Sequence, residues 1–252
     1  MLGGNGVVRS EAMNPYLFPL KDRKEIAEGT MAFSFDTAGS EFAFEAGQNA
    51  DFTLLDPPKT DAEGNRRTFS FASSPRHKDF LMVATRMRPT AFKESLRSLP
   101  IGTRVQVEGP GGNMVLHEDA RKPAVFLAAG IGITPFRSML EWATEEQLPV
   151  PLFLFYSNRT PAAAAFLADF EEWAKRNANI RFIPTITESP NSHWRYETGR
   201  IGEAMLRKYL KDLGEPIYYL AGPPAVVTGL RKLLLELGVS RDSIKLESFS
   251  GY

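Results

Sequence analysis

The chain of 252 residues contains no cysteine. It can therefore hold neither a disulfide nor a cysteine-ligated iron-sulfur cluster, and nucleophilic catalysis by a thiol is excluded. Its three histidines, His77, His117 and His193, lie far apart in the sequence and lack the spacing of metal ligands. Solvated or capping roles are favoured for them, and we expect no metal site.

An excess of charge and long apolar runs are also missing. Thirty basic and thirty acidic residues give a net charge of zero, which argues against a nucleic-acid partner or a membrane-surface binder. No apolar run approaches the roughly 18 residues of a transmembrane helix, so no membrane insertion is expected. The start, residues 1–6, lacks the basic and apolar regions of a signal peptide. A cytoplasmic monomer is the expectation.

From residue 124 onward, apolar runs alternate with amphipathic helical patterns. This alternation predicts a doubly wound α/β fold, in which a parallel sheet carries helices on both faces. Ligands of such sheets bind at the carboxyl ends of the strands. The expected strands are 124–129, 151–157, 180–187, 217–221 and 244–247, and the expected helices are 135–147, 161–176, 200–213 and 224–237.

The first half of the chain has a different pattern. Strand-like segments at 31–36, 51–55, 68–72, 80–87 and 104–108 are separated by Gly, Pro and Asp turns, and only 90–99 has a helical pattern. This is typical of an antiparallel β-barrel or sandwich. We expect a disordered extension or tag at 1–12, a barrel domain at 13–120 and an α/β domain at 121–252, with the seam in the polar stretch 118–122.

The sequence GIGITP, residues 130–135, follows the first strand of the second half. It fits neither the dinucleotide fingerprint nor the Walker pattern. Its glycines let the backbone turn sharply and let a bulky ligand approach. We expect Thr134 to cap the next helix and Pro135 to be its first residue, which leaves free N–H groups for an anion. A tight turn that binds nothing is the alternative, and the position at a strand end favours the anion site.

Two stretches of the first half combine basic, hydroxyl and aromatic residues. In RRTFSFASSP, residues 66–75, the two-residue period of a strand separates Arg67, Phe69 and Phe71 from Thr68, Ser70 and Ala72. Such a strand can hold a flat ring beside a phosphate, although an ordinary barrel strand fits the pattern as well. In TRMRPTAFKESL, residues 85–96, basic residues surround a helix start, where they oppose the helix dipole unless an anion is bound.

Five ordered motifs carry a family resemblance: RTFS (67–70), TAFK (90–93), VEGPGG (107–112), AAGIGITPF (128–136) and YYLAGPP (218–224). Together they resemble the ferredoxin-NADP reductase family of flavoproteins, over nearly the whole chain after about residue 20. The resemblance implies that the barrel binds FAD and that the α/β domain binds NADPH or NADH. The absence of cysteine means that this chain lacks the fused iron-sulfur domain of oxygenase reductases.

The resemblance implies roles position by position. Arg67 would contact a flavin-side phosphate, Phe69 would stack on the isoalloxazine ring, and Ser70 would hydrogen-bond near flavin N5. The residues expected to bind FAD are Arg67, Thr68, Phe69, Ser70, Val83, Ala84, Thr85, Thr90, Ala91, Phe92 and Lys93. Those expected to bind the nicotinamide nucleotide are Gly130, Gly132, Thr134, Ser157, Arg159, Gly222 and Pro223.

The implied reaction is hydride transfer from nicotinamide C4 to flavin N5, for which no side-chain general base is needed. Ser70, Glu247 and Tyr252 are the candidate catalytic residues, with Ser70 and Glu247 assisting protonation at N5. The ending LESFSGY brings Glu247, Phe249 and Tyr252 to where the family places a carboxylate and an aromatic ring, although a mobile tail would also fit. Many relatives have a cysteine where this chain has Ala221.

Nucleotide choice and electron acceptor are less constrained. Ser157 and Arg159 can bind a 2'-phosphate and favour NADPH, whereas acidic residues at 169, 171 and 172 oppose it. Electrons must pass to a separate acceptor. Ferredoxin or flavodoxin would meet basic residues at 86, 88, 93 and 97, and a reductase of free flavin, a quinone or an oxygenase component is the alternative. A non-catalytic nucleotide-sensing flavoprotein is the other class, but the presence of both nucleotide motifs favours the enzyme.

Overall fold

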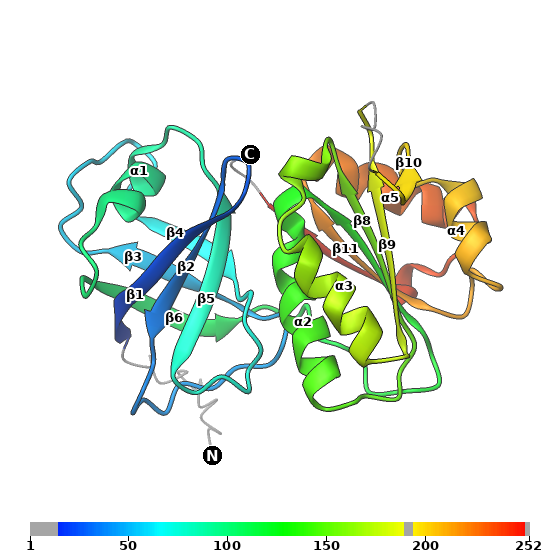
Figure 1. The fold of residues 1–252 in the computed structure, drawn as a ribbon, viewed down its shortest axis with the longest axis horizontal. Helices are drawn as coiled ribbons and strands as arrows, with labels where there is room; N and C mark the ends of the chain where they lie inside the picture. The colour runs from blue at the N-terminus through cyan, green and yellow to red at the C-terminus, as the bar shows by residue number, and fades with distance from the viewer. Residues whose placement is uncertain (1–14, 189–193, 250–252) are drawn as a thin grey trace, which may run out of the picture.

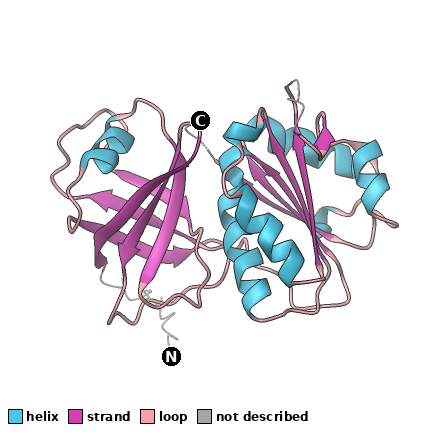
Figure 2. Ribbon diagram, viewed as in Figure 1, coloured by secondary structure: helices cyan, strands magenta, loops and turns pink. Residues whose placement is uncertain are grey.

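A computed structural model describes residues 15–188 and 194–249, and these form two adjacent lobes (Figure 1). An antiparallel sheet with one helix comes first, and a parallel sheet covered by helices follows (Figure 2). The fold class expected from the sequence is confirmed. The last strand of the first sheet ends at Gly111 and the first strand of the second begins at Ala124. The expected extension at 1–12 lies outside the described residues.

The first lobe is a six-stranded antiparallel sheet with the strand order β4-β3-β6-β1-β2-β5. A bridge between Phe71, just beyond β4, and Val83 of β5 joins the two edge strands, so the sheet closes into a barrel. The elements are β1 (Tyr16–Ala27), β2 (Thr30–Asp36), β3 (Asn49–Leu54), β4 (Arg66–Ser70), β5 (Phe80–Arg86), α1 (Ala91–Ser98) and β6 (Arg104–Gly111).

Aromatic side chains fill the barrel. In β3 every second residue is buried, and Phe52 contacts Phe35 and Phe69 inside the barrel. Helix α1 is short and covers one end, where its Phe92 and Leu96 join the same core. Strand alternation therefore leaves the other face of each strand available to solvent or to a neighbouring structure.

Strand β1 was not expected from the sequence. Its first residues, up to Pro19, pair with β6, whereas Leu20 and later residues pair with β2. Its first five residues form a short apolar run without alternation, and the polar run Lys21–Glu25 follows it. A strand that changes partner at a proline and becomes charged lacks the pattern by which strands are recognised.

The second lobe is a six-stranded parallel sheet with the order β10-β9-β8-β7-β11-β12. The chain runs outward from β7 through β8 and β9, then returns to the other side of β7 through β11 and β12. The elements are β7 (Ala124–Ala129), η1 (Gly130–Ile133), α2 (Thr134–Glu145), β8 (Leu152–Asn158), η2 (Pro161–Ala163), α3 (Leu167–Arg176), β9 (Ile180–Ile186), β10 (Glu197–Thr198), α4 (Glu203–Tyr209), β11 (Ile217–Gly222), α5 (Pro224–Glu236), η3 (Arg241–Ser243) and β12 (Ile244–Ser248).

Every residue of β7 is buried, as expected for a central parallel strand covered on both faces. Phe126 packs with Phe136 of α2 on one face, and Leu127 belongs to the core formed with Leu230 of α5 on the other. Figure 1 shows α2 on the side of the sheet that faces the barrel. The chain reverses direction across the sheet at β7, so the carboxyl end of β7 is a topological switch point.

The helix expected at 161–176 is shorter in the structure and begins at Leu167. Residues 161–163 form a 3-10 turn, and Phe166 adopts a left-handed backbone conformation with φ of 60°. Such a residue cannot continue an α-helix. The helix expected at 200–213 likewise spans only residues 203–209. Among the described residues, no helix combines the length and the apolar character needed to cross a membrane.

Candidate functional site

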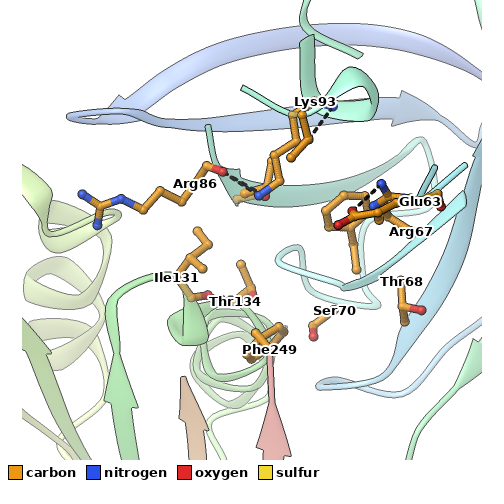
Figure 3. A pocket seen from close by; sticks show the side chains of 13 residues that line it. Glu63, Arg67, Thr68, Ser70, Arg86, Lys93, Ile131, Thr134 and Phe249 are labelled. Atoms are coloured by element: carbon orange, nitrogen blue, oxygen red, sulfur yellow. Dashed lines mark hydrogen bonds and ion pairs between the residues drawn. The ribbon is translucent and has the colours of Figure 1, made fainter. Parts of the chain in front are cut away.

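A cleft of about 270 Å³ opens between the barrel and the carboxyl end of the parallel sheet (Figure 3). Its volume is close to the lower end of the range for small-molecule sites, roughly 300 Å³. The barrel supplies cationic, hydroxyl and aromatic groups, while the second lobe supplies residues of the GIGITP loop and of the segment after β12. The lining residues are Glu63, Arg67, Thr68, Phe69, Ser70, Ala84, Thr85, Arg86, Thr90, Lys93, Ile131, Thr134 and Phe249.

Ser70 at the end of β4 connects the two lobes. Its hydroxyl donates to Oε1 of Glu247 at 3.1 Å, and the Asn49 side-chain amide donates to the same oxygen at 3.2 Å. Glu247 reaches this position because β12 pairs with β11, with Glu247 opposite Ala221. The other oxygen, Oε2, is buried and has no hydrogen-bond partner among the described residues.

Burial raises the pKa of Glu247 above its ordinary value, although the hydrogen bonds from Asn49 and Ser70 act in the opposite direction. A carboxyl group with a raised pKa can hold a proton at a higher pH than an exposed glutamate. Glu247 is therefore suited to hold and release a proton beside Ser70.

Phe249 follows β12 and lines the cleft, and its backbone N–H donates to the carbonyl of Gly222 at 3.1 Å. Figure 3 shows its ring near Thr134 and Ser70. The aromatic residue found in the cleft at this end of the chain is thus Phe249. Tyr252, the candidate catalytic aromatic residue, lies outside the described residues.

The GIGITP loop forms a 3-10 turn, η1, followed directly by α2. The expectation that Thr134 caps α2 is wrong, because Thr134 is already helical and its hydroxyl donates to the Ile131 carbonyl at 3.2 Å. A Cβ on Gly132 would lie only 2.4 Å from the carbonyl carbon of Ala221, so this glycine lets the turn pack against β11. Gly130 has φ of 53°, which glycine adopts without strain.

Residues at the start of α1 already have partners within the chain. The Thr90 hydroxyl caps the helix by accepting from the Lys93 N–H at 3.4 Å, as expected. The Ala91 N–H donates to the Asp61 carboxylate at 3.0 Å. The Lys93 ammonium donates to the Arg86 carbonyl at 2.8 Å (Figure 3). A phosphate bound here would take the place of the Asp61 carboxylate.

Positive charges gather around this helix start. Burial first, and then the nearby charges of Arg88 and Arg67, lower the pKa of Lys93 to about 8. Arg67 is itself paired with Glu63 at 2.8 Å and with Asp61 at 3.8 Å. The carboxylates of Glu63 and Asp61 thus neutralise a positive charge that a bound anion could neutralise in their place.

Several of the residues that we expected to contact the flavin point mainly into the interior of the barrel. Phe69 lines the cleft but is largely buried against Phe52 and Phe92. Val83 and Phe92 belong to the barrel core, whereas Ala84 and Thr85 line the cleft. Thr68 also lines it, with its hydroxyl hydrogen-bonded to Asp51. Which of them contact a flavin stays a prediction.

The remaining expected nucleotide residues lie at the carboxyl edge of the parallel sheet. Ser157 pairs with Ala129 at the ends of β8 and β7. Arg159 is exposed and forms an ion pair with Glu188, with 2.6 Å between Arg159 Nη2 and Glu188 Oε1. Gly222 ends β11 and Pro223 precedes α5, beside the loop that contains Gly132.

Sequence reasoning missed part of the site. Asn49, which binds Glu247, and Ile131, which lines the cleft beside Thr134, were not expected there. Asp61 and Glu63 come from a loop whose polar sequence is typical of any exposed turn. Only the three-dimensional pairing of β3 with β4 brings Asn49 opposite Ser70.

Comparison with known proteins supports the arrangement. Residues 126–232 match the family described as the oxidoreductase NAD-binding domain. A cytochrome P450 reductase from Amycolatopsis has the same fold over 92% of this chain and 69% of its own, with 25% identity and a TM-score of 0.79. These matches support an assignment of the chain to flavoprotein oxidoreductases that resemble ferredoxin-NADP reductase.

Two curated relatives are longer than the chain. One component of the Na⁺-translocating NADH-quinone reductase of Methylococcus capsulatus is 25% identical over 86% of the chain and 58% of its own length. Reductase component 1 of a terephthalate 1,2-dioxygenase from Comamonas is 25% identical over 84% of the chain and 61% of its own length. The chain thus spans about three fifths of these relatives. In the part that the structure describes, no group of three or more acidic or histidine side chains is arranged to hold a metal.

Proposed function

We propose that the chain is an FAD-dependent oxidoreductase that takes hydride from a reduced nicotinamide nucleotide and passes electrons to a separate acceptor. The observation that carries this proposal is the contact between Ser70 and Glu247. It joins the strand expected beside the flavin to the lobe expected to bind the nucleotide, at a cleft that also contains Thr134. Hydride transfer requires the two cofactors to meet at such a junction.

The donor set of the cleft fits FAD. Arg67, Lys93 and the start of α1 would hold its phosphates, and Phe69 and Phe249 offer aromatic surfaces to a flat ring. When bound, FAD would accept the hydride and release the electrons to the acceptor. The carboxylates of Asp61 and Glu63 would have to turn away from the phosphates, and their position on the largely exposed loop 56–65 leaves room for this.

Ser70 and Glu247 would serve the proton that accompanies reduction at flavin N5. The Ser70 hydroxyl is 3.1 Å from a carboxylate whose pKa is raised by burial, so a proton can pass between them. Asn49 fixes the orientation of that carboxylate from the opposite strand.

The ion pair of Arg159 and Glu188 favours NADH as the donor. A 2'-phosphate would have to displace Glu188 from Arg159 and would then lie beside a like charge. The neutral 2'-hydroxyl of NADH can accept from Arg159 or donate to Glu188 without that repulsion. This reverses the preference for NADPH that Ser157 and Arg159 suggest in sequence, and the quinone reductase relative is named for NADH.

The acceptor is proposed to be a small acidic redox protein such as ferredoxin or flavodoxin. Arg88, just before α1, and Arg97, in its last turn, are exposed on the barrel, where they can attract such a partner. The relatives include a reductase component of a dioxygenase, which makes an oxygenase component the runner-up. A cytoplasmic location remains the proposal from the sequence.

An anaerobic visible absorption titration tests the reaction. The purified protein is loaded with FAD and mixed with NADH in one cuvette and NADPH in another. Rapid bleaching of the flavin bands with NADH, and slower bleaching with NADPH, is the expected result. A protein that takes up no FAD would contradict the flavin assignment, and bound flavin that neither nucleotide bleaches would favour a nucleotide sensor.

A further inference from the structure

Helix α2 touches the barrel one turn beyond the cleft. Its first residue, Thr134, lines the cleft, and Arg137 follows three positions later. The barrel segment that α2 contacts, residues 72–77, directly continues the strand that carries Ser70. The same helix and the same strand therefore carry both the cleft residues and the contact between the lobes.

Arg137 is the centre of this contact. Its side chain is 10% exposed, and Nη1 donates to the Ala72 carbonyl at 2.5 Å. Nε and Nη2 donate to Asp169 of α3 at 3.1 and 2.8 Å. The guanidinium also lies over the rings of Phe166 and Trp173, at 4.6 and 5.1 Å from their centroids. Arg137 is thus held by its own lobe while it binds the backbone of the other.

Neighbouring residues extend the contact. The Ser138 hydroxyl donates to the Ser73 carbonyl at 2.7 Å, and the Ser74 N–H donates to Glu141 at 2.7 Å. The Ser73 hydroxyl accepts from the Met82 N–H at 3.0 Å, which attaches the segment to β5. The barrel segment is therefore fixed on both sides, and a movement of α2 would be transmitted to it.

A buried guanidinium is expensive to desolvate, and aliphatic side chains of similar size would pack at the same place. What arginine adds is geometry, because its planar group donates in several fixed directions at once. Lysine keeps the charge but cannot reach Ala72 and Asp169 together in that planar arrangement.

We propose that Arg137 is a positioning residue for hydride transfer, which sets the separation of the nicotinamide and flavin rings. The inference rests on the proposed function. Arg137 ties Ala72, two residues beyond Ser70, to the helix that starts at Thr134. Displacements of about 1 Å between reacting groups can slow a reaction by about 100-fold, so this contact is placed to control the rate.

The kinetic test uses Arg137→Met and Arg137→Lys, with Arg207→Lys as the matched control. Arg207 pairs with Glu203 at 2.7 Å on exposed α4, far from the contact. Stopped-flow reduction of the bound flavin is followed with NADH and with NADH carrying deuterium at C4. The rate at saturation should fall by about tenfold or more in both Arg137 variants, with an altered isotope effect, while the nucleotide Kd changes less than about threefold.

The geometric test needs no turnover. Because the chain has no cysteine, spin labels can be attached at two introduced ones, Lys24→Cys in β1 and Glu172→Cys in α3, both exposed. Double electron-electron resonance should give one narrow distance distribution in the wild-type background and a broadened one with Arg137→Met. If the Arg137 variants fail to fold, Ser138→Ala, which removes one bond, should give smaller changes of the same kind.

The outcomes separate the two proposals. If wild-type flavin is not reduced by either nucleotide, the proposed function fails, and the distance distributions still decide whether Arg137 sets the lobe geometry. If the Arg137 variants keep both the wild-type reduction rate and the narrow distribution, the positioning role is overturned. A lower melting temperature with unchanged rate and distribution would reduce Arg137 to a stabilising residue.

Discussion

The hydroxyl of Ser70 and the carboxylate of Glu247 are hydrogen-bonded across the two lobes at 3.1 Å, although 177 positions separate them in the chain. Ser70→Ala should keep FAD bound but slow its reduction by NADH by about tenfold or more, because the proton route beside the ring is interrupted. Anaerobic stopped-flow absorption measures this rate. An unchanged rate would remove Ser70 from the reaction.

Glu247 should also affect stability as a function of pH. Its folded pKa is raised, so the folded state binds the proton more tightly than the unfolded state, whose pKa is near 4.5. Stability should fall as pH rises from about 4.5 through the folded pKa and then stay level. Glu247→Gln has no carboxyl group to titrate. The melting temperature of this variant, relative to that of the wild type, should therefore rise as the pH increases over the same range. Parallel melting curves for the two proteins at all pH values would contradict this.

His77 should give a second dependence on pH. Its hydrogen bond to Glu141, together with the charges of Glu141, Glu145 and Asp79, raises its pKa against the effect of burial. The stabilisation that protonated His77 gives the folded state is fully present below pH 6.5. It is lost as the pH rises through the raised pKa of the folded state. Melting curves of His77→Gln should converge with the wild type above that pKa and lie lower below it.

Glu188 should control nucleotide preference. Glu188→Gln removes the negative charge beside Arg159, and kcat/KM for NADPH should rise by about three- to tenfold, the effect of about 1 kcal/mol. The value for NADH should change less. Glu203→Gln breaks an exposed ion pair on α4 and serves as the control. A wild-type preference for NADPH would contradict the assignment.

Gly132 should tolerate no side chain. In Gly132→Ala the new Cβ would lie 2.4 Å from the backbone of Ala221, so η1 or β11 must shift. We expect a loss of nucleotide-driven flavin reduction, with destabilisation of about 2 kcal/mol or more. Gly229→Ala in α5 is the matched control, because an added Cβ there would meet no atom within 4 Å apart from the adjacent residues and backbone of its own helix. Alanine there should stabilise the helix by about 1 kcal/mol.

Acceptor docking can be tested on the barrel surface. Reversing two charges, with Arg88→Glu and Arg97→Glu together, should raise the KM for ferredoxin by about tenfold at low salt and less at high salt. Reduction of ferricyanide, a small acceptor, should change little. Equal losses with both acceptors would point to damage in the flavin site instead of the docking surface.

The sequence predicted elements whose pattern is local and regular. Strand β7 has an unbroken apolar run and was expected at its observed limits. Prediction failed where tertiary structure overrides local pattern. Strand β1 changes partner at Pro19, and Phe166 takes a left-handed conformation with its ring under the Arg137 guanidinium. Neither the change of strand partner nor the left-handed residue produces a periodic pattern in the sequence.

The residues of the candidate site likewise fall into those that the sequence could identify and those that it could not. Ser70 and Glu247 could be named because the motifs that contain them resemble those of the family. Asn49 and Arg137 could not, because their roles arise from the pairing of distant segments. The capping role expected for Thr134 was wrong because η1 already supplies the first helical turn.

The bridge between Phe71 and Val83 closes the barrel, and the next residues, 72–74, are bound by α2. Closure of the first lobe and attachment of the second thus depend on consecutive residues. Such sharing makes the lobes one cooperative unit, which should unfold in a single calorimetric transition whose van't Hoff and calorimetric enthalpies agree. Breaking the Arg137 tie should divide that transition into two.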